Sequence, residues 1–181
     1  TTESPKVPWG PREYFSREEF EADLKRLVAY YRDRGYPDVR VKSFDVRLSD
    51  DQKSVRLKID IEEGEPIRVE RVELTGLDPI PEDHRRNLEA RFPLKAGEPL
   101  DRALVQSSRE AALDELKDHG YPNPDVKVSE MPGSSDRLRI ISYTALPGRL
   151  AYVGQIEIAG TSSVNERIVR RQLTFRRGQL F

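Results

Sequence analysis

The sequence contains no cysteine and only two histidines, His84 and His119, among its 181 residues. The lack of cysteine excludes disulfide bonds, thiolate catalysis and thiolate metal sites. With only two imidazoles available, a histidine zinc site is not expected, and we predict surface or helix-capping roles for both residues. His119 precedes a predicted helix end, where a histidine interacts favourably with the helix dipole.

Long apolar runs and an excess of positive charge are also missing. No stretch approaches the roughly 18 apolar residues that a membrane helix needs, and the N-terminus does not resemble a signal peptide. The 31 basic and 32 acidic residues nearly balance, so composition gives no general electrostatic reason to expect a nucleic-acid partner. The charged fraction of 35% suits small modules with a large surface relative to their volume.

Signatures of catalysis are scarce. The acidic pairs at 50–51 and 62–63 fall in predicted turns, where solvated carboxylates are common. The glycines do not form a phosphate-binding loop. Arginine-rich segments near 85–86 and 167–177 are interpreted as solvated helix faces, because nearby acidic residues balance them. We therefore predict no catalytic residue, no cofactor-binding residue, no metal ligand and no enzymatic activity.

What the sequence does contain is an internal repeat. Residues 15–76 and 100–160 share one order of features: an amphipathic segment, a Gly-Tyr-Pro stop, two alternating strands and a third strand that ends in glycine. The segment that follows each final glycine also repeats, as Leu94–Leu100 and again as Phe175–Phe181. This order predicts a tandem array of similar units, from which the chain is a piece.

The boundaries of the first long helix are explicit. Ser16 and Glu19 form a capping-box pattern, and apolar residues then recur at three- and four-residue spacing. Gly35 is placed to close the helix in a left-handed conformation, Tyr36 to pack back on it, and Pro37 to prevent its continuation. A second long helix begins after Asp101 and ends at the equivalent Gly-Tyr-Pro. Short helices are expected at about 82–92 and 164–173.

Alternating apolar residues predict the strands. They are expected over 39–48, 55–61, 67–74, 126–131, 138–146 and 150–158, with a bulge near Ser43 where the alternation changes phase. Cutting the array at its glycine turns gives units ordered strand, helix, helix, strand, strand. The predicted fold class is α+β, a small mixed sheet covered on one face by two helices.

Three units are predicted on this basis. Residues 1–66 hold the C-terminal part of a first unit behind a proline-rich tail that we interpret as a linker. Residues 67–149 hold a complete unit, and residues 150–181 hold the N-terminal part of a third.

This pattern resembles POTRA domains, the polypeptide-transport-associated modules of outer-membrane assembly and translocation proteins. The resemblance covers essentially the whole chain. The most specific pieces are Gly35-Tyr36-Pro37 and its repeat at 120–122, supported by the strand ending at Gly76 and the approach Gly97–Leu100. It implies the β-α-α-β-β order and, in tandem, a periplasmic arm similar to those of BamA-type or TamA-type factors, which continue into a membrane β-barrel.

The resemblance also implies a mechanism. The strand after each long helix lies at a sheet edge, and an open edge can accept an extended peptide by backbone pairing. The expected partners are unfolded outer-membrane polypeptides, accessory assembly proteins and the β-barrel of the same protein; no cofactor and no nucleic acid are implied. Basic residues on these edges could equally protect them against aggregation. The candidate binding residues are Val39, Val41, Phe44, Val46, Val126, Val128 and Met131.

Three other functions remain open at this point. One is a docking module of a single-span cell-division protein, and another is the transporter of a two-partner secretion pair, both of which carry POTRA-like modules. Tandem copies argue against the first. A third is an RNA-binding α/β domain, which the balanced charge disfavours.

Overall fold

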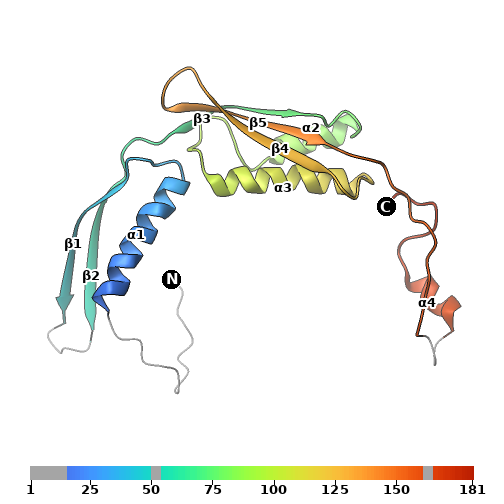
Figure 1. Ribbon diagram of the computed structural model, residues 1–181, viewed down its shortest axis with the longest axis horizontal. Coiled ribbons are helices and arrows are strands. Elements are labelled where there is room, and N and C mark those ends of the chain that lie inside the picture. Colours follow the sequence, from blue (N-terminus) through green and yellow to red (C-terminus); the bar gives the residue numbers. More distant parts are fainter. Residues whose placement is uncertain (1–15, 50–53, 161–164) are drawn as a thin grey trace.

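The computed structural model describes residues 16–49, 54–160 and 165–181, so the predicted proline-rich linker lies outside the described residues. We call residues up to 66 the N-terminal unit, 67–149 the central unit and 150–181 the C-terminal unit. Figure 1 shows the central unit in the middle, with α1, β1 and β2 at one end and α4 at the other. The elements are α1 (Arg17–Asp33), β1 (Arg40–Leu48), β2 (Val55–Glu62), β3 (Arg68–Thr75), α2 (Glu82–Arg91), α3 (Arg102–Asp118), β4 (Asp125–Pro132), β5 (Leu138–Leu146) and α4 (Glu166–Gln172).

Helix α1 begins and ends where its sequence predicts. The Ser16 hydroxyl accepts a hydrogen bond from the amide of Glu19 at 3.4 Å, which satisfies one free donor of the first turn. At the other end Gly35 has a φ of +90°, and the amide of Tyr36 donates back to the carbonyl of Tyr31. This is a Schellman ending, accompanied by the predicted contact between the two tyrosine rings, whose centroids lie 6.0 Å apart.

The N-terminal unit contains a two-stranded antiparallel sheet. The β1–β2 register shifts between Val41 and Ser43, which confirms the predicted bulge. Beyond the bulge, Phe44 pairs with Ile59 and Val46 pairs with Leu57, so apolar side chains gather on one face. Helix α1 covers part of that face, where Phe20 and Phe44 meet edge to face with ring centroids 5.3 Å apart.

The central unit holds a three-stranded mixed sheet in the order β3-β5-β4. Strand β5 lies between the other two, parallel to β3 and antiparallel to β4. Helices α2 and α3 cover one face, which confirms the predicted α+β class and its β-α-α-β-β order. Asp101 caps α3 by accepting from the amide of Ala103 at 2.7 Å, and Gly120 closes it with a φ of +86°.

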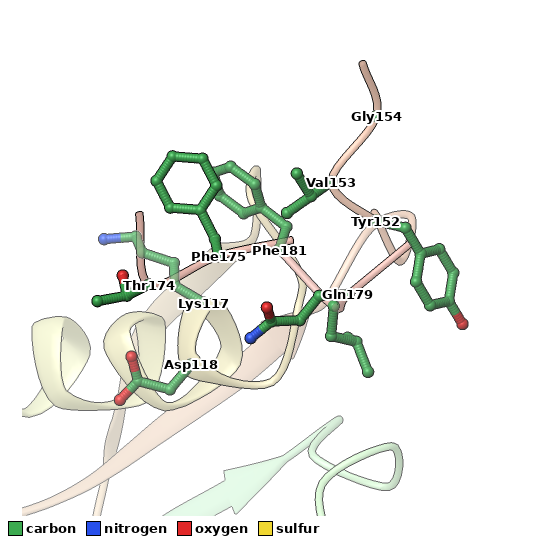
Figure 2. A pocket seen from close by; sticks show the side chains of 10 residues that line it. Lys117, Asp118, Tyr152, Val153, Gly154, Thr174, Phe175, Gln179 and Phe181 are labelled. Atoms are coloured by element: carbon green, nitrogen blue, oxygen red, sulfur yellow. The ribbon is translucent and has the colours of Figure 1, made fainter. Parts of the chain in front are cut away.

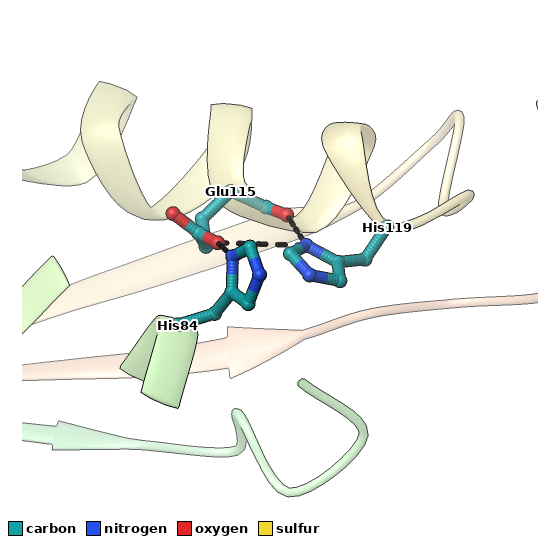
Figure 3. Close-up of side chains that lie close together, drawn as sticks. All are labelled: His84, Glu115 and His119. Atoms are coloured by element: carbon teal, nitrogen blue, oxygen red, sulfur yellow. Dashed lines mark hydrogen bonds and ion pairs between the residues drawn. The ribbon is translucent and has the colours of Figure 1, made fainter. Parts of the chain in front are cut away.

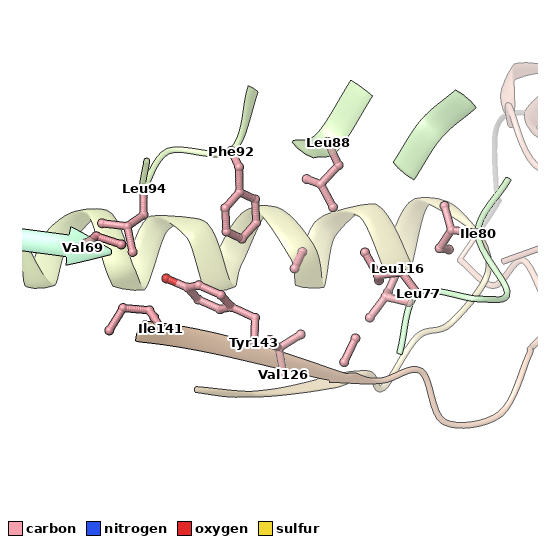
Figure 4. Close-up of a cluster of buried hydrophobic side chains, with 12 residues drawn as sticks. Val69, Leu77, Ile80, Leu88, Phe92, Leu94, Leu116, Val126, Ile141 and Tyr143 are labelled. Atoms are coloured by element: carbon pink, nitrogen blue, oxygen red, sulfur yellow. The ribbon is translucent and has the colours of Figure 1, made fainter. Parts of the chain in front are cut away.

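The main hydrophobic core lies between this sheet and its two helices (Figure 4). Tyr143 from β5 is fully buried at its centre, and its ring meets Phe92 edge to face with centroids 5.1 Å apart. The packed cluster is formed by Val69, Leu77, Ile80, Leu88, Phe92, Leu94, Ala112, Leu116, Val126, Ile141, Tyr143 and Ala145.

The prediction of a strand at 150–158 is wrong. Residues 150–160 form no strand; a few backbone hydrogen bonds to residues 178–181 surround an isolated bridge between Tyr152 and Leu180. The equivalent strand in the central unit, β3, pairs with β5, and the described residues of the C-terminal unit include no strand equivalent to β5. Helix α4 begins at Glu166, later than predicted, and Asn165 caps it by accepting from the amide of Arg167.

The units join through repeated backbone contacts. The amide of Ile67 donates to the carbonyl of Gly35 at 2.8 Å, and the amide of Ala151 donates to the carbonyl of Gly120 at 2.9 Å. Each long helix thus ends against the first residues of the unit that follows. Within residues 16–49, 54–160 and 165–181, the helices lack the combination of length and apolar character needed to span a bilayer.

Candidate functional site

Strand β4 lies at one edge of the central sheet. It pairs with β5 from Asp125 to Pro132 without a register shift. The described residues place no strand on its other side. A strand in this position carries a row of amides and carbonyls that face outward, which is the geometry that strand addition requires.

The contacts of β4 show which residues face outward. The carbonyl of Val126 accepts a hydrogen bond from the Arg109 guanidinium on α3 at 2.7 Å, so this carbonyl points away from β5. The amide and carbonyl of one residue point to the same side of an antiparallel strand, and the side alternates along the chain. The backbone groups of Val128 and Glu130 therefore face outward as well.

Arg109 occupies part of this edge. Its guanidinium also binds the Asp125 carboxylate at 3.0 Å, so one side chain spans the start of β4. The ion pair is partly solvent-exposed, which makes its contribution to stability small. An incoming peptide that pairs along the whole of β4 has to replace the bond from Arg109 to Val126.

The opposite edge of the sheet, β3, is partly covered. The amide of Val69 donates to the carbonyl of Glu98 at 2.9 Å, and the amide of Gly97 donates to the carbonyl of Val69 at 2.7 Å. Arg68 additionally forms a bridge with Pro99. The segment that leads into α3 therefore pairs with the first residues of β3 and leaves less of this edge free.

The three candidate residues on β4 have different environments. The side chain of Val126 is buried in the core, so only its backbone faces outward, and Arg109 binds its carbonyl. Val128 lies on the same face of the strand but is 37% exposed, so the apolar surface continues past the core. Met131 is exposed, and its position on the opposite face of the strand separates it from these two residues.

The four candidate residues near β1 are also dispersed. Val39 precedes the strand and is buried, while Val41 is half-buried beside the bulge. Phe44 and Val46 are exposed, but they lie on the apolar face of the two-stranded sheet. In the central unit two helices cover the equivalent face, whereas the described residues of the N-terminal unit supply only α1. Their exposure therefore reflects partial covering of this face rather than a separate groove.

A cavity of about 870 Å³ lies between the end of α3 and the C-terminal unit (Figure 2). Its apolar lining includes Val153 and Phe175, which occupy the repeat positions of the core residues Val69 and Leu94. Because the described C-terminal unit has no equivalents of α3 and β5, these positions remain uncovered. The cavity is thus the open core side of this unit rather than a ligand pocket.

Sequence reasoning missed one arrangement of polar residues. The two histidines, predicted to act separately, lie together around Glu115 (Figure 3). His119 does cap α3, as predicted, but its ring also contacts that of His84, with centroids 4.6 Å apart. The four-residue spacing of Glu115 and His119 places both on one helix face, and the sequence could have indicated that these two residues lie together. The position of His84 against them depends on how α2 packs on α3.

Comparisons with known proteins agree on one family. The chain is 24% identical over 160 residues to the outer membrane protein assembly factor BamA of Neisseria meningitidis, covering 88% of this chain. It is also 24% identical over 171 residues to a putative outer membrane protein assembly factor of Treponema pallidum, covering 92% of this chain. In both matches the chain spans about a fifth of the relative's length, 20% in each case.

A solved structure and a family model match as well. The crystal structure of POTRA3-5 of Haemophilus influenzae BamA superimposes with a TM-score of 0.54 and 21% identity, covering 96% of this chain and 66% of that one. This likeness concerns the fold. The family described as "POTRA: Surface antigen variable number repeat" matches twice, at residues 5–64 and 67–143. With most of its residues in these two matches, the chain belongs to the POTRA family.

Proposed function

We propose that the chain is a periplasmic scaffold that binds unfolded outer-membrane polypeptides by adding them as a strand to β4. The supporting observation is the position of β4 at the sheet edge, with the backbone groups of Val128 and Glu130 facing outward. Backbone hydrogen bonds recognise an extended chain with little regard to its sequence. That tolerance suits a module that meets many different polypeptides.

Side chains along β4 would add a modest preference. An added strand places alternate side chains on each face of the sheet. On the core-side face they would meet exposed Val128, and on the other face they would meet Met131. Polypeptides with alternating apolar residues, as in the strands of membrane β-barrels, fit this arrangement.

The candidate residues of the N-terminal unit form a second, weaker binding edge in this proposal. Val41 and the exposed Phe44 and Val46 would contact an added strand along β1. The bulge between Val41 and Ser43 interrupts the regular spacing of hydrogen bonds that a long peptide would need. We therefore expect tighter binding at β4, where no such shift occurs.

In the wider proposal, the module belongs to an outer-membrane protein and passes its substrates to a membrane β-barrel of the same protein. Its exposed surfaces would also dock accessory assembly proteins. This role requires binding and release only, without a cofactor or a chemical step. The division into three units, at 1–66, 67–149 and 150–181, is part of the same proposal.

Proline substitution on β4 tests strand addition. Val128→Pro removes an outward-facing amide while leaving the inward-facing ladder to β5 in place. We expect it to weaken binding of a labelled, extended outer-membrane peptide at least about fivefold, roughly the value of one lost hydrogen bond. Val128→Ala is the matched control, because it shortens the side chain and keeps the amide. Affinity is measured by fluorescence anisotropy, and amide NMR shifts locate the peptide.

Three results would overturn the proposal. One is equal affinity for the proline variant and the unaltered chain, provided that amide spectra show the β4–β5 ladder to be intact. Another is a set of peptide-induced shifts confined to the outer surfaces of the helices. A loss of affinity that is equal in both variants would assign recognition to the Val128 side chain and thus also contradict backbone pairing.

A further inference from the structure

Glu115 is a buried carboxylate on the inner side of α3. It is only 4% exposed, and an ionised carboxylate in such a position requires compensation by opposite charge or hydrogen bonds. Three side chains supply it. Arg91 binds Oε2 at 2.8 Å, His84 lies 3.2 Å from Oε1 through its Nδ1, and the Nδ1 of His119 lies 3.5 Å from the same oxygen.

The two carboxylate oxygens thus have different neighbours. Oε2 is held by the permanent positive charge of Arg91. Oε1 faces two imidazoles and no other basic group among the described contacts. In each neutral imidazole, the Nδ1 that faces Oε1 carries the proton in one tautomer and has a free lone pair in the other. In metal sites a ligating carboxylate is commonly fixed by a hydrogen bond to its second oxygen. Arg91 stands in that position here.

We propose that His84, Glu115 and His119 bind a divalent transition-metal ion, with Zn²⁺ as the best fit. Candidate ligand atoms of the three residues all lie within 4.8 Å of one another (Figure 3). In a tetrahedral zinc site with bonds of about 2.0–2.1 Å, neighbouring ligand atoms lie about 3.3 Å apart. The distances from Oε1 to the two Nδ1 atoms, 3.2 and 3.5 Å, bracket this value.

The donor set selects the class of metal. Two imidazoles and one carboxylate suit zinc and its first-row neighbours, whereas calcium and magnesium prefer sites built of oxygen. Binding through Nδ1 requires each neutral imidazole to carry its proton on Nε2. His119 then gives up its 2.7 Å contact with the backbone carbonyl of Glu115. The fourth position is left for water, because the His84 side chain is half-exposed.

The site would link the two helices of the central unit. Glu115 and His119 are four residues apart on α3 and share one face, while His84 comes from the first turn of α2. A metal held by both helices binds the folded chain and not the unfolded one, so it raises the free energy of unfolding by mass action. The expected consequence is a central unit whose stability depends on available zinc.

Calorimetric titration with ZnCl₂ tests the site on the full 181-residue chain with any affinity tag removed. We expect one equivalent of Zn²⁺ to bind with a micromolar dissociation constant and to shift the ring signals of both histidines. His84→Gln and His119→Gln should each weaken binding at least about tenfold, the lower end of the effect of groups that merely orient a ligand. Glu110→Gln, an exposed carboxylate change on the same helix, is the matched control.

Thermal melting supplies a second measurement. At one fixed zinc concentration, zinc should raise the melting temperature of the unaltered chain and of Glu110→Gln, and should raise that of both histidine variants by clearly less. Gln at position 84 keeps a donor for Glu115, so that variant is expected to fold. The inference is overturned if millimolar Zn²⁺ gives no binding heat, if the histidine variants bind as tightly as the unaltered chain, or if shifted signals lie elsewhere.

Discussion

Gly76 ends β3 in a backbone conformation that favours glycine. Its φ is +80°, and a Cβ placed on it would overlap the carbonyl oxygen of Ala145 on β5. The repeat-related Gly160 has the same φ but nothing within 4 Å of such a Cβ, because the described C-terminal unit has no strand like β5. The glycine at the end of this strand is therefore needed for close approach as well as for the turn.

Substituting Gly76 should reveal both effects. Gly97 is a matched position, since its φ is +87° and a Cβ there meets nothing within 4 Å. We expect Gly97→Ala to lower the free energy of unfolding by about 1–2 kcal/mol through backbone strain alone. Gly76→Ala should cost clearly more, because β5 has to move. Urea denaturation measures both variants, and equal losses would show that the close approach is unimportant.

Tyr143 makes the central core sensitive to alkaline pH. Burial raises the pKa of its phenol to about 12, and the hydroxyl donates to the carbonyl of Val105 at 3.2 Å. Since an unfolded tyrosine titrates near 10, folding favours the neutral phenol. Its contribution is fully present below pH 10 and is lost as the pH rises through about 12.

Comparing Tyr143→Phe with the unaltered chain at two pH values tests this contribution. Between pH 8 and pH 11 the unaltered chain should lose about 1 kcal/mol more unfolding free energy than Tyr143→Phe, which has no phenol to titrate. Urea midpoints at each pH measure this difference. The phenylalanine variant also serves as the control for the other titrating groups. Parallel losses in both proteins would mean that folding does not raise the pKa of the Tyr143 phenol.

At the scale of elements, the helix endings were the most predictable features. Gly35 and Gly120 both close Schellman motifs, because glycine, an aromatic residue and proline together allow few other backbone paths. The strand at 150–158 was predicted by the same alternation as β3 but did not form. An alternating pattern of apolar residues indicates which side chains share a face, whereas a strand also needs hydrogen-bond partners for its backbone groups.

Arg109 is the side chain that most directly limits access to β4. Arg109→Gln shortens the side chain and removes its charge, which should release the carbonyl of Val126. We expect a peptide long enough to pair with Val126 to bind about two- to tenfold more tightly, the range for one hydrogen bond. A shorter peptide that pairs only beyond Val128 is the control and should be unaffected. Unchanged or weaker binding of the long peptide would show that Arg109 does not compete with it.

At the scale of the whole molecule, the same junction is built twice. Ile67 also accepts a hydrogen bond from the amide of Leu100 at 2.8 Å, and Ala151 accepts one from the amide of Phe181 at 3.1 Å. Repetition of sequence predicted similar units but not these contacts, which depend on how each helix end meets the next unit. The histidine cluster was likewise not predicted, because it forms between two segments that are distant in the sequence.

The first junction also has three ion pairs between the described residues of the two units, Arg34–Asp101, Asp33–Arg102 and Asp38–Arg137. Asp101 accepts from Arg34 at 2.7 Å with its Oδ2, while its Oδ1 caps α3 through the amide of Ala103. Asp101→Asn separates these roles, because asparagine remains a good helix cap but loses the charge. We expect α3 to stay intact and the N-terminal unit to reorient more freely relative to the central unit.

Residual dipolar couplings of the two units measure this reorientation. In Asp101→Asn the alignment tensors of the N-terminal and central units should diverge, whereas they agree in the unaltered chain. Arg86→Gln, which breaks an exposed ion pair with Glu82 on α2, is the control and should leave the tensors in agreement. Agreement in Asp101→Asn as well would mean that the remaining contacts between the units, such as the Asp38–Arg137 ion pair and the backbone bond from Ile67 to Gly35, fix the orientation without Arg34–Asp101.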